Sequence, residues 1–254
     1  VSAEDSLAVM AAYIKGEDRL HMAYSFELLT DDYSASYIRQ TVEALEASIG
    51  DGWPCWAIGN HDVQRVASRW GQGKQNSDMV KMLNAMLSSL RGSICSYQGE
   101  ELGLTEAPIE YNELQDPFGK TFWPMFKGRD GCRTPMPWQQ GADFSGFSDV
   151  SPWLPIPPAH QALAVDVQES DADSMLNGYR RFLAWRKLHP VLVEGDIKFV
   201  DTKEPILAFV RTLGDIKVLV GFNLGDTEVE FDFSAFEISE SLTGHGLKTA
   251  QIEH

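Results

Sequence analysis

Short apolar runs alternate with amphipathic helical stretches over residues 7–97, and this alternation constrains the fold more than any other feature of the sequence. Apolar positions recur at helical spacing in three stretches, residues 7–14, 34–49 and 77–90. Compact apolar runs typical of strands lie at residues 21–29, 55–59 and 94–97. Strands that alternate with such helices predict βαβ units and a parallel sheet. Three strands fit either a small open sheet or the last part of a larger closed barrel.

Residues 99–173 interrupt this alternation. They hold nine of the twelve prolines and three of the seven tryptophans, without any regular period. A loop of this length is usually functional, and its aromatic content favours a packed, functional insertion. A helix is predicted after it, from about Ser174 to His189, and we expect Pro190 to end that helix.

From Glu194 onward the apolar period changes to two. Two sets of apolar residues alternate with their neighbours: Val218, Val220 and Phe222, and then Val229, Phe231 and Phe233. This pattern predicts an antiparallel module with one solvated face. We therefore place a domain boundary near residue 190, with an α/β domain over residues 1–190, which includes the long loop 99–173, and a small antiparallel β domain over residues 191–254.

The charge of the chain narrows the partners that we expect. Its 254 residues include 21 Lys and Arg against 37 Asp and Glu, which gives a net charge of −16. Such a field repels phosphate backbones and anionic lipids, so we expect neither a nucleic-acid nor a membrane partner. The longest apolar run has eight residues, far short of the roughly 18 that span a bilayer. No basic segment followed by an apolar stretch opens the chain, so we expect no signal peptide.

Cysteine and histidine spacing gives no support to a metal site or a disulfide framework. The three cysteines, Cys55, Cys95 and Cys132, are odd in number and widely spaced, which fits a reducing compartment and predicts a cytoplasmic protein. No HExxH or Cys/His pattern is present, so we expect no metal and no cofactor in this chain. The patterns of phosphate-binding loops, dinucleotide-binding turns and serine-hydrolase elbows are absent as well.

The first candidate site is Gly59-Asn60-His61-Asp62, at the carboxyl end of a buried strand. In α/β folds ligands bind at that end, because the loops that follow the strands open there. A carboxylate beside an imidazole can hold hydroxyl groups, tune a neighbouring acid or bind a metal. The alternative is structural: Asp62 would cap the next segment, and His61 would donate to a backbone carbonyl.

Two further motifs carry charged residues. Residues 128–138 (GRDGCRTPMPW) place two arginines in the proline-rich loop, where a guanidinium can orient sugar hydroxyls or a carboxylate. For Arg129 this interpretation and a structural one are equally balanced, whereas for Arg133 we favour an ion pair with Asp130 that fixes the loop. Glu100 and Glu101 are adjacent and point in different directions, so we expect one of them to be hydrogen-bonded structurally.

Taken together and in this order, GNHD, YQGEELG and GRDGCRTPMPW resemble the α-glucosidase and oligo-1,6-glucosidase branch of glycoside hydrolase family 13, the α-amylase superfamily. The resemblance covers the whole chain. It implies the C-terminal part of a (β/α)8 barrel, in which residues 21–29, 55–59 and 94–97 are the sixth, seventh and eighth strands. It also implies a small β-sandwich domain after the final barrel helix.

The resemblance further implies what the chain does and what it lacks. Family members are retaining enzymes whose nucleophile and acid/base lie upstream of Val1, so we expect this chain to be inactive without the N-terminal half of its barrel. Asp62 would be the third carboxylate, which stabilises the transition state, and His61 would contact the same sugar. Arg129 would contact that sugar or its carboxylate neighbours. The substrate would be a short oligosaccharide or disaccharide, from whose non-reducing end glucose is released. Any calcium or magnesium of the kind that some relatives bind would lie in the missing part.

Two alternatives to hydrolysis stay open at this point. A relative with the same site can transfer the glucosyl group to another acceptor, as the trehalose- and sucrose-isomerising members do. A non-catalytic member would keep the barrel and serve as a binding or transporter partner. Those members usually have degraded catalytic motifs and a membrane helix, whereas His61 and Asp62 are intact here.

Overall fold

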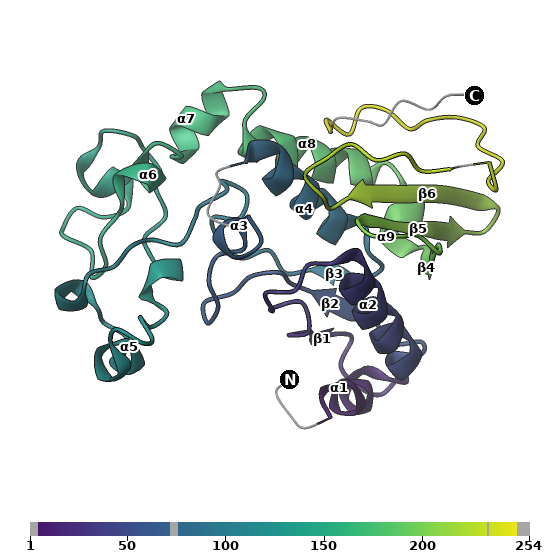
Figure 1. Cartoon of the computed structure of the whole chain (residues 1–254), viewed down its shortest axis with the longest axis horizontal. Coiled ribbons are helices and arrows are strands. Elements are labelled where there is room, and N and C mark those ends of the chain that lie inside the picture. Colours follow the sequence, from purple (N-terminus) through teal and green to yellow (C-terminus); the bar gives the residue numbers. More distant parts are fainter. Residues whose placement is uncertain (1–4, 72–75, 233, 248–254) are drawn as a thin grey trace. The chain divides into compact units, whose positions relative to one another are not determined.

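A computed structural model of the chain describes residues 5–71, 76–232 and 234–247 (Figure 1). The α-helices over these residues are α1 Ser6–Ile14, α2 Ala35–Ile49, α3 Val66–Arg69, α4 Ser77–Ser89, α5 Pro117–Phe122, α6 Pro158–Gln161, α7 Val165–Ser170, α8 Met175–Lys187 and α9 Pro190–Glu194. The strands are β1 Ala23–Tyr24, β2 Pro54–Trp56, β3 Ser93–Ile94, β4 Asp196–Phe199, β5 Ile206–Leu213 and β6 Ile216–Asn223. Short 3-10 turns occur at Tyr111–Glu113, Asp130–Cys132 and Asp143–Gly146.

The chain divides into two compact units and passes between them more than once. The first contains the described residues of Val1–Ala57, Ala85–Cys95 and Arg181–His254, and the second those of Ile58–Asn84 and Ser96–Arg180. None of these passages lies at residue 190. The domain boundary near that residue therefore stays a prediction.

The first unit contains the predicted parallel sheet. Its strand order is β1-β2-β3, with Tyr24 opposite Cys55 and Trp56 opposite Ile94. The strands are two or three residues long, shorter than the apolar runs that predicted them. Ala57 and Ile58 follow β2 and are fully buried without belonging to it. Burial of consecutive apolar residues does not by itself distinguish a strand from a buried loop.

The helix α2 forms as the sequence predicts. The Ser34 hydroxyl accepts a hydrogen bond from the backbone N–H of Tyr37, which satisfies one of the free donors at the helix start. The predicted apolar stripe is completely buried: Ile38, Val42, Leu45 and Ile49. Gly50 ends the helix with a φ of 59°, a left-handed conformation that glycine adopts without strain.

The C-terminal sheet is antiparallel, in the order β4-β5-β6, and confirms the period-two pattern around Val220. The prediction of a strand at residues 229–233 is wrong for the described part, because residues 229–232 belong to no strand and Val229 is exposed; Phe233 lies outside the described residues. Alternation marks a two-faced segment, but a strand also needs a hydrogen-bonded neighbour. After residue 190, the described residues form this one sheet only. The second sheet expected for a sandwich is therefore not present among them.

Arg211 on β5 connects this sheet to the end of α4 and to α9. Its side chain is fully buried, and its guanidinium donates to four backbone carbonyl oxygens. Two of these carbonyls belong to Ser89, at the end of α4, and Leu192, in α9, at 2.6 and 3.0 Å. The other two belong to Gly195 and Asp196. One side chain thus satisfies acceptors that helix ends leave unpaired.

The second unit contains the long proline-rich segment, which is packed as predicted. Two small apolar clusters hold it: Leu102, Leu104 and Leu176, and then Ala107, Ile109 and Leu114. His160 on α6 is buried and contacts the carbonyl oxygen of Thr105 at 2.8 Å. Most of the segment between these clusters has no regular secondary structure, and α5, α6 and α7 are short.

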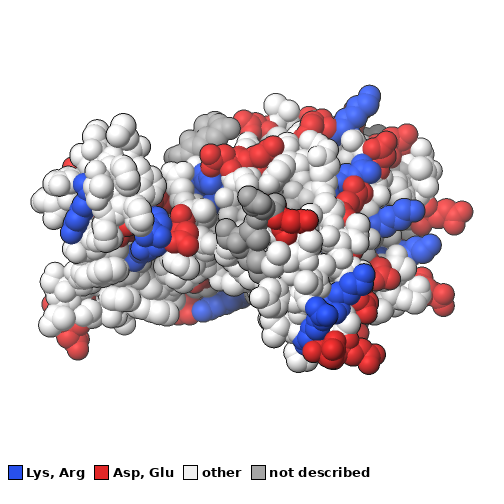
Figure 2. Space-filling view, turned by 90° about the horizontal axis from the view of Figure 1, so that it is seen from below, with Lys and Arg blue, Asp and Glu red and all other residues white. Residues whose placement is uncertain are grey.

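The surface carries charges of both signs. Figure 2 shows that on one face the Lys and Arg side chains lie among Asp and Glu side chains. None of the helices within the described ranges is long and apolar enough to span a membrane.

Candidate functional site

The segment Gly59-Asn60-His61-Asp62 follows β2 along the chain and forms a tight turn. The Asn60 side-chain oxygen accepts hydrogen bonds from the backbone N–H groups of Asp62 and Val63, at 2.8 and 3.2 Å. Such an Asx turn fixes the backbone direction locally. The next helix, α3, has Arg65 at its N-cap and no side-chain cap, so the structural alternative in which Asp62 caps the next segment is wrong.

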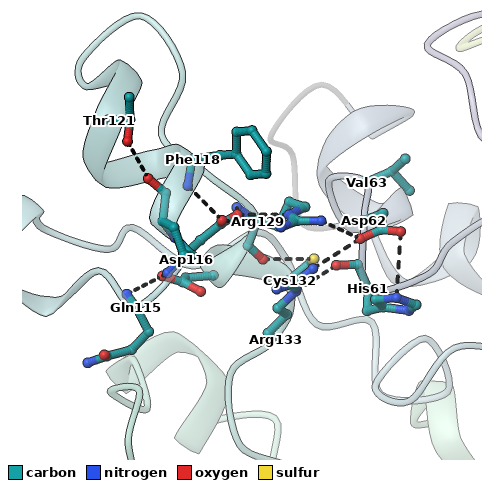
Figure 3. A network of polar contacts seen from close by, with 12 residues as sticks. His61, Asp62, Val63, Gln115, Asp116, Phe118, Thr121, Arg129, Cys132 and Arg133 are labelled. Atoms are coloured by element: carbon teal, nitrogen blue, oxygen red, sulfur yellow. Dashed lines mark hydrogen bonds and ion pairs between the residues drawn. The ribbon is translucent and has the colours of Figure 1, made fainter.

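Asp62 lies at the surface, where three cationic or polar side chains surround its carboxylate (Figure 3). Its Oδ1 accepts hydrogen bonds from Arg129 Nη1 and Arg133 Nη2, each at 3.0 Å. Its Oδ2 lies 3.5 Å from His61 Nε2. The Asp62 side chain remains 48% exposed, so a ligand can reach it from solvent.

The Arg129 guanidinium also binds the carboxylate of Asp116, the N-cap residue of α5. Arg129 Nε donates to Asp116 Oδ2 at 2.8 Å, and Nη2 donates to Oδ1 at 3.2 Å. This two-pronged geometry is the strongest that an arginine and a carboxylate form. Hydrogen bonds from Arg129 lower the pKa of Asp116 to about 2, and the same contact raises the pKa of Arg129 above its usual value. Figure 3 shows Arg129 between Asp116 and Asp62.

A glycine beside Arg129 allows this close approach. Gly128 has a φ of +83°, a conformation that residues with a side chain rarely adopt. A Cβ added there would lie 3.2 Å from Asp116 Cβ. The position therefore favours glycine for its backbone and for the space it leaves.

Arg133 has different partners from those predicted. Its Nε donates to the His61 carbonyl oxygen at 2.7 Å, and its Nη2 reaches Asp62. Asp130, the expected partner, instead accepts the backbone N–H groups of Gln115 and Asp116 at 2.6 and 2.8 Å. The expected Arg133–Asp130 pair is wrong, because the Asp130 carboxylate is occupied by backbone N–H groups at the start of α5 and the Arg133 guanidinium by the GNHD segment.

The pair of adjacent glutamates is structural, as expected for at least one of them. Glu100 is buried, and its Oε2 accepts from Ser96 Oγ and the Tyr97 N–H at 3.1 and 3.0 Å. Burial raises its pKa to about 7. Glu101 accepts the Gly99 N–H at 2.8 Å. A Cβ at Gly59 would lie 2.3 Å from Glu100 Oε1, so the buried glutamate packs directly against the start of the GNHD segment.

The sequence interpretation missed Asp116 and misassigned Arg133. An aspartate before a proline signals a helix start, and the Asp116 carboxylate does accept the Phe118 N–H at 3.0 Å. Nothing local indicates that the same carboxylate also holds Arg129, 13 residues further along the chain. In the described part of the chain, no group of three or more His, Cys, Asp and Glu side chains is placed to hold a metal ion. The sugar-binding roles of His61, Asp62 and Arg129 stay predictions.

Comparisons with known proteins agree on one family. A family model described as alpha amylase, catalytic domain, matches residues 3–195. A protein named "Probable alpha-glucosidase" from Rhizobium meliloti (strain 1021) is 45% identical over 250 residues, which is 98% of this chain and 45% of that protein. An oligo-1,6-glucosidase from Parageobacillus thermoglucosidasius is 28% identical over 239 residues, which is 82% of this chain and 42% of that protein. The chain thus spans a little under half the length of these curated relatives.

Solved structures give the same result for the fold. An alpha-glucosyl transfer enzyme, XgtA, matches with a TM-score of 0.94 and 52% identity, over 100% of this chain and 47% of that one. An isomaltulose synthase from Klebsiella sp. LX3 matches with a TM-score of 0.78 and 27% identity, over 86% of this chain and 45% of that one. The fold of this chain therefore occurs within larger chains, one of an alpha-glucosyl transfer enzyme and one of an isomaltulose synthase.

Proposed function

This chain belongs to the alpha-amylase family, and from that premise we propose that a protein containing it is a retaining α-glucosidase. Its substrates would be short α-glucosides, from whose non-reducing end it releases glucose. The observation that carries this proposal is the half-exposed carboxylate of Asp62, which two arginines hold and which His61 accompanies. The names of the relatives, alpha-glucosidase and oligo-1,6-glucosidase, support the same reaction.

We propose that β1, β2 and β3 are the sixth, seventh and eighth strands of a (β/α)8 barrel. Their parallel order without insertion of another strand supports this assignment, because sequential barrel strands are neighbours. GNHD then follows the seventh strand at its carboxyl end, where barrel enzymes bind their substrates. The sheet β4-β5-β6 would belong to the small C-terminal domain predicted over residues 191–254.

The chemistry of the proposed site needs carboxyl groups that this chain does not supply. Retaining hydrolysis uses two of them about 5–5.5 Å apart, one to attack the anomeric carbon and one to protonate the leaving oxygen. Both would come from the N-terminal half of the barrel. Asp62 would accept hydrogen bonds from two sugar hydroxyls, and its charge would help to keep the acid protonated. His61 would donate to a hydroxyl whose hydrogen bonding strengthens in the transition state, and Arg129 would contact the same sugar.

Replacement of Asp62 tests the proposal directly. In the full-length protein, Asp62→Asn should lower kcat/KM for maltose or isomaltose by more than about tenfold, or about 1.4 kcal/mol in the barrier. Glu169→Gln is a matched control, because it removes an exposed carboxylate that is paired with one arginine, Arg180, at 2.8 Å. Activity of Asp62→Asn within tenfold of the unmodified protein would contradict the assigned role.

A glucosyl-transfer reaction is the second candidate. The match to XgtA at 52% identity and to an isomaltulose synthase at 27% favours it, since both names describe transfer or isomerisation. Chromatography of the products from maltose and from sucrose separates the two reactions. Free glucose as the main product supports hydrolysis, whereas a new glucoside or a sucrose isomer supports transfer.

A further inference from the structure

We propose that Asp116 is a positioning residue that, through Arg129, holds the Asp62 carboxylate in the orientation in which it receives substrate. The inference rests on the proposed function, because Asp62 is the residue assigned to the sugar. It adds a residue to the site that the sequence motifs did not indicate. The three side chains form a continuous chain of hydrogen bonds within one compact unit (Figure 3).

Asp116 has no access to a ligand of its own. Its side chain is completely buried, and both of its oxygens accept hydrogen bonds. Oδ1 accepts from the Phe118 N–H and Arg129 Nη2, while Oδ2 accepts from the Arg129 N–H and Nε. Any effect of Asp116 on a reaction at the surface therefore has to pass through a neighbour, and Arg129 is the neighbour that also contacts Asp62.

The buried carboxylate of Asp116 fixes the orientation of the Arg129 guanidinium. A free arginine side chain samples many rotamers, and fixing one of them costs conformational entropy. The bond pair to Asp116 fixes the plane of the guanidinium and leaves Nη1 directed at Asp62 Oδ1, 3.0 Å away. Without Asp116, Arg129 loses the bond pair that orients its guanidinium and keeps only the Phe118 ring, 5.8 Å from Cζ, and the Asp62 carboxylate itself.

The segment that carries Asp116 is itself held in place. Asp130 is buried, and its Oδ2 accepts the backbone N–H groups of Gln115 and Asp116. Two adjacent residues therefore bind the start of α5. The Arg129 guanidinium binds the Asp116 side chain, and the Asp130 carboxylate binds the backbone just before the helix. This arrangement keeps the Asp116 carboxylate at a fixed distance from the arginine.

Removal of the Asp116 charge gives the first test. In the full-length protein, Asp116→Asn should lower kcat/KM for maltose by about 10- to 100-fold, which is typical when a residue that orients a direct contact is lost. The loss should lie mainly in kcat, because the orientation of Asp62 matters most in the transition state. The control Glu169→Gln, which breaks another carboxylate–arginine contact of 2.8 Å in the same unit, should stay within about twofold. An Asp116→Asn protein within about threefold of the unmodified one would overturn the proposal.

Chemical rescue of an arginine variant gives a second test. Arg129→Ala leaves a space bounded by the Asp116 carboxylate, and millimolar guanidinium chloride should restore its activity by about tenfold or more. The double variant Arg129→Ala/Asp116→Asn should not be rescued, because the carboxylate that binds the guanidinium is gone. Equal rescue of both proteins, or rescue of neither, would overturn the assigned link.

A structural measurement separates this proposal from the proposed function. If the unmodified protein turns over neither maltose nor isomaltose, the function fails, whereas the positioning role remains open to crystallography. In a crystal structure of full-length Asp116→Asn, Arg129 Nη1 should no longer lie within hydrogen-bond distance of Asp62 Oδ1. An unchanged contact would overturn the positioning role whether or not the protein is a glucosidase.

Discussion

Glu100 is the single residue with the clearest consequence for pH. Its pKa is raised from 4.5 to about 7 by burial, which outweighs the hydrogen bonds that its carboxylate accepts from Tyr97 and Ser96. Between these two values the folded chain retains a proton that the unfolded chain has lost. The contribution of Glu100 to folding stability is therefore fully present below about pH 4.5 and is lost as the pH rises toward 7.

His160 affects the pH dependence of folding stability in the opposite direction. Burial lowers its pKa from 6.5 to about 4, so the folded chain lacks a proton that the unfolded chain binds in this range. Its contribution to stability is present above pH 6.5 and is lost as the pH falls toward 4. In the window from about 4.5 to 6.5 the two groups oppose each other.

We therefore expect the Glu100→Gln variant to show the pH dependence of folding stability that His160 causes. The thermal midpoint of the full-length variant should rise from pH 4.5 to 6.5, where that of the unmodified protein changes little. At pH 8 the variant should melt higher, since glutamine carries no buried charge. Differential scanning calorimetry at pH 5, 6.5 and 8 measures this, with Glu101→Gln as the control. Parallel pH profiles for Glu100→Gln and the unmodified protein would contradict the prediction.

At the candidate site, the sequence identified residues but not their contacts. Gly59-Asn60-His61-Asp62 and the arginine-containing loop could be chosen because their residue types suit a sugar site and they follow predicted strands. Asp116 could not be chosen, since its local pattern indicates only a helix cap. The pairing of Arg133 with Asp62 joins residues 71 apart, and no local rule specifies a contact over that separation.

At the scale of elements, replacement of Arg211 tests how much its buried hydrogen bonds to the C-terminal sheet and the helix ends stabilise the fold. Arg211→Ala should lower the thermal midpoint by at least about 4 °C more than the control Arg180→Ala. The reason is that four carbonyl oxygens lose their donor in a buried setting, whereas Arg180 is half exposed and pairs with one carboxylate. Burial lowers the pKa of Arg211 to about 10, so it stays charged at neutral pH.

The measurement is a thermal unfolding scan of both full-length variants in the same buffer. Arg211→Lys adds a second comparison, because an ammonium group cannot reach four carbonyls in a planar arrangement. Equal midpoints for Arg211→Ala and Arg180→Ala would show that the buried guanidinium adds nothing to stability.

Helices were more predictable than strands, for a physical reason. The stripe and the caps of α2 are local features, and Ser34 and Gly50 lie where the pattern placed them. A strand depends on a partner that is distant in sequence, so the run at residues 21–29 contains only two strand residues and the run at 94–97 only one, Ile94. Pro190 was predicted to end a helix, and it also occupies the first turn of α9, a position that does not need its missing N–H.

At the scale of the whole molecule, apolar side chains near β1 are exposed beside an open edge of the parallel sheet. β1 and β3 each pair with one strand only in the described sheet. Leu20, Met22 and Phe26 flank β1 and are between 41% and 58% exposed. An open strand edge beside apolar side chains is a site for association with another chain.

We expect residues 1–254, produced alone, to aggregate or to remain partly molten, and to release no glucose from maltose. Size-exclusion chromatography with light scattering and a glucose assay check both statements, with the full-length protein as the control. A soluble monomer with one sharp unfolding transition would contradict the first expectation. Glucose release by this stretch alone would contradict the placement of the nucleophile and the acid/base outside it.

The buried guanidinium of Arg211 also limits which tails this chain can accept in a chimera. It originates on β5 but donates to the carbonyl of Ser89, more than a hundred positions earlier, so the two regions share one geometric requirement. A chimera joined at residue 190 with a tail from a distant homologue inherits the acceptor from one parent and the donor from another. Grafts that preserve an arginine at this point of the sheet are the ones compatible with the inherited helix ends.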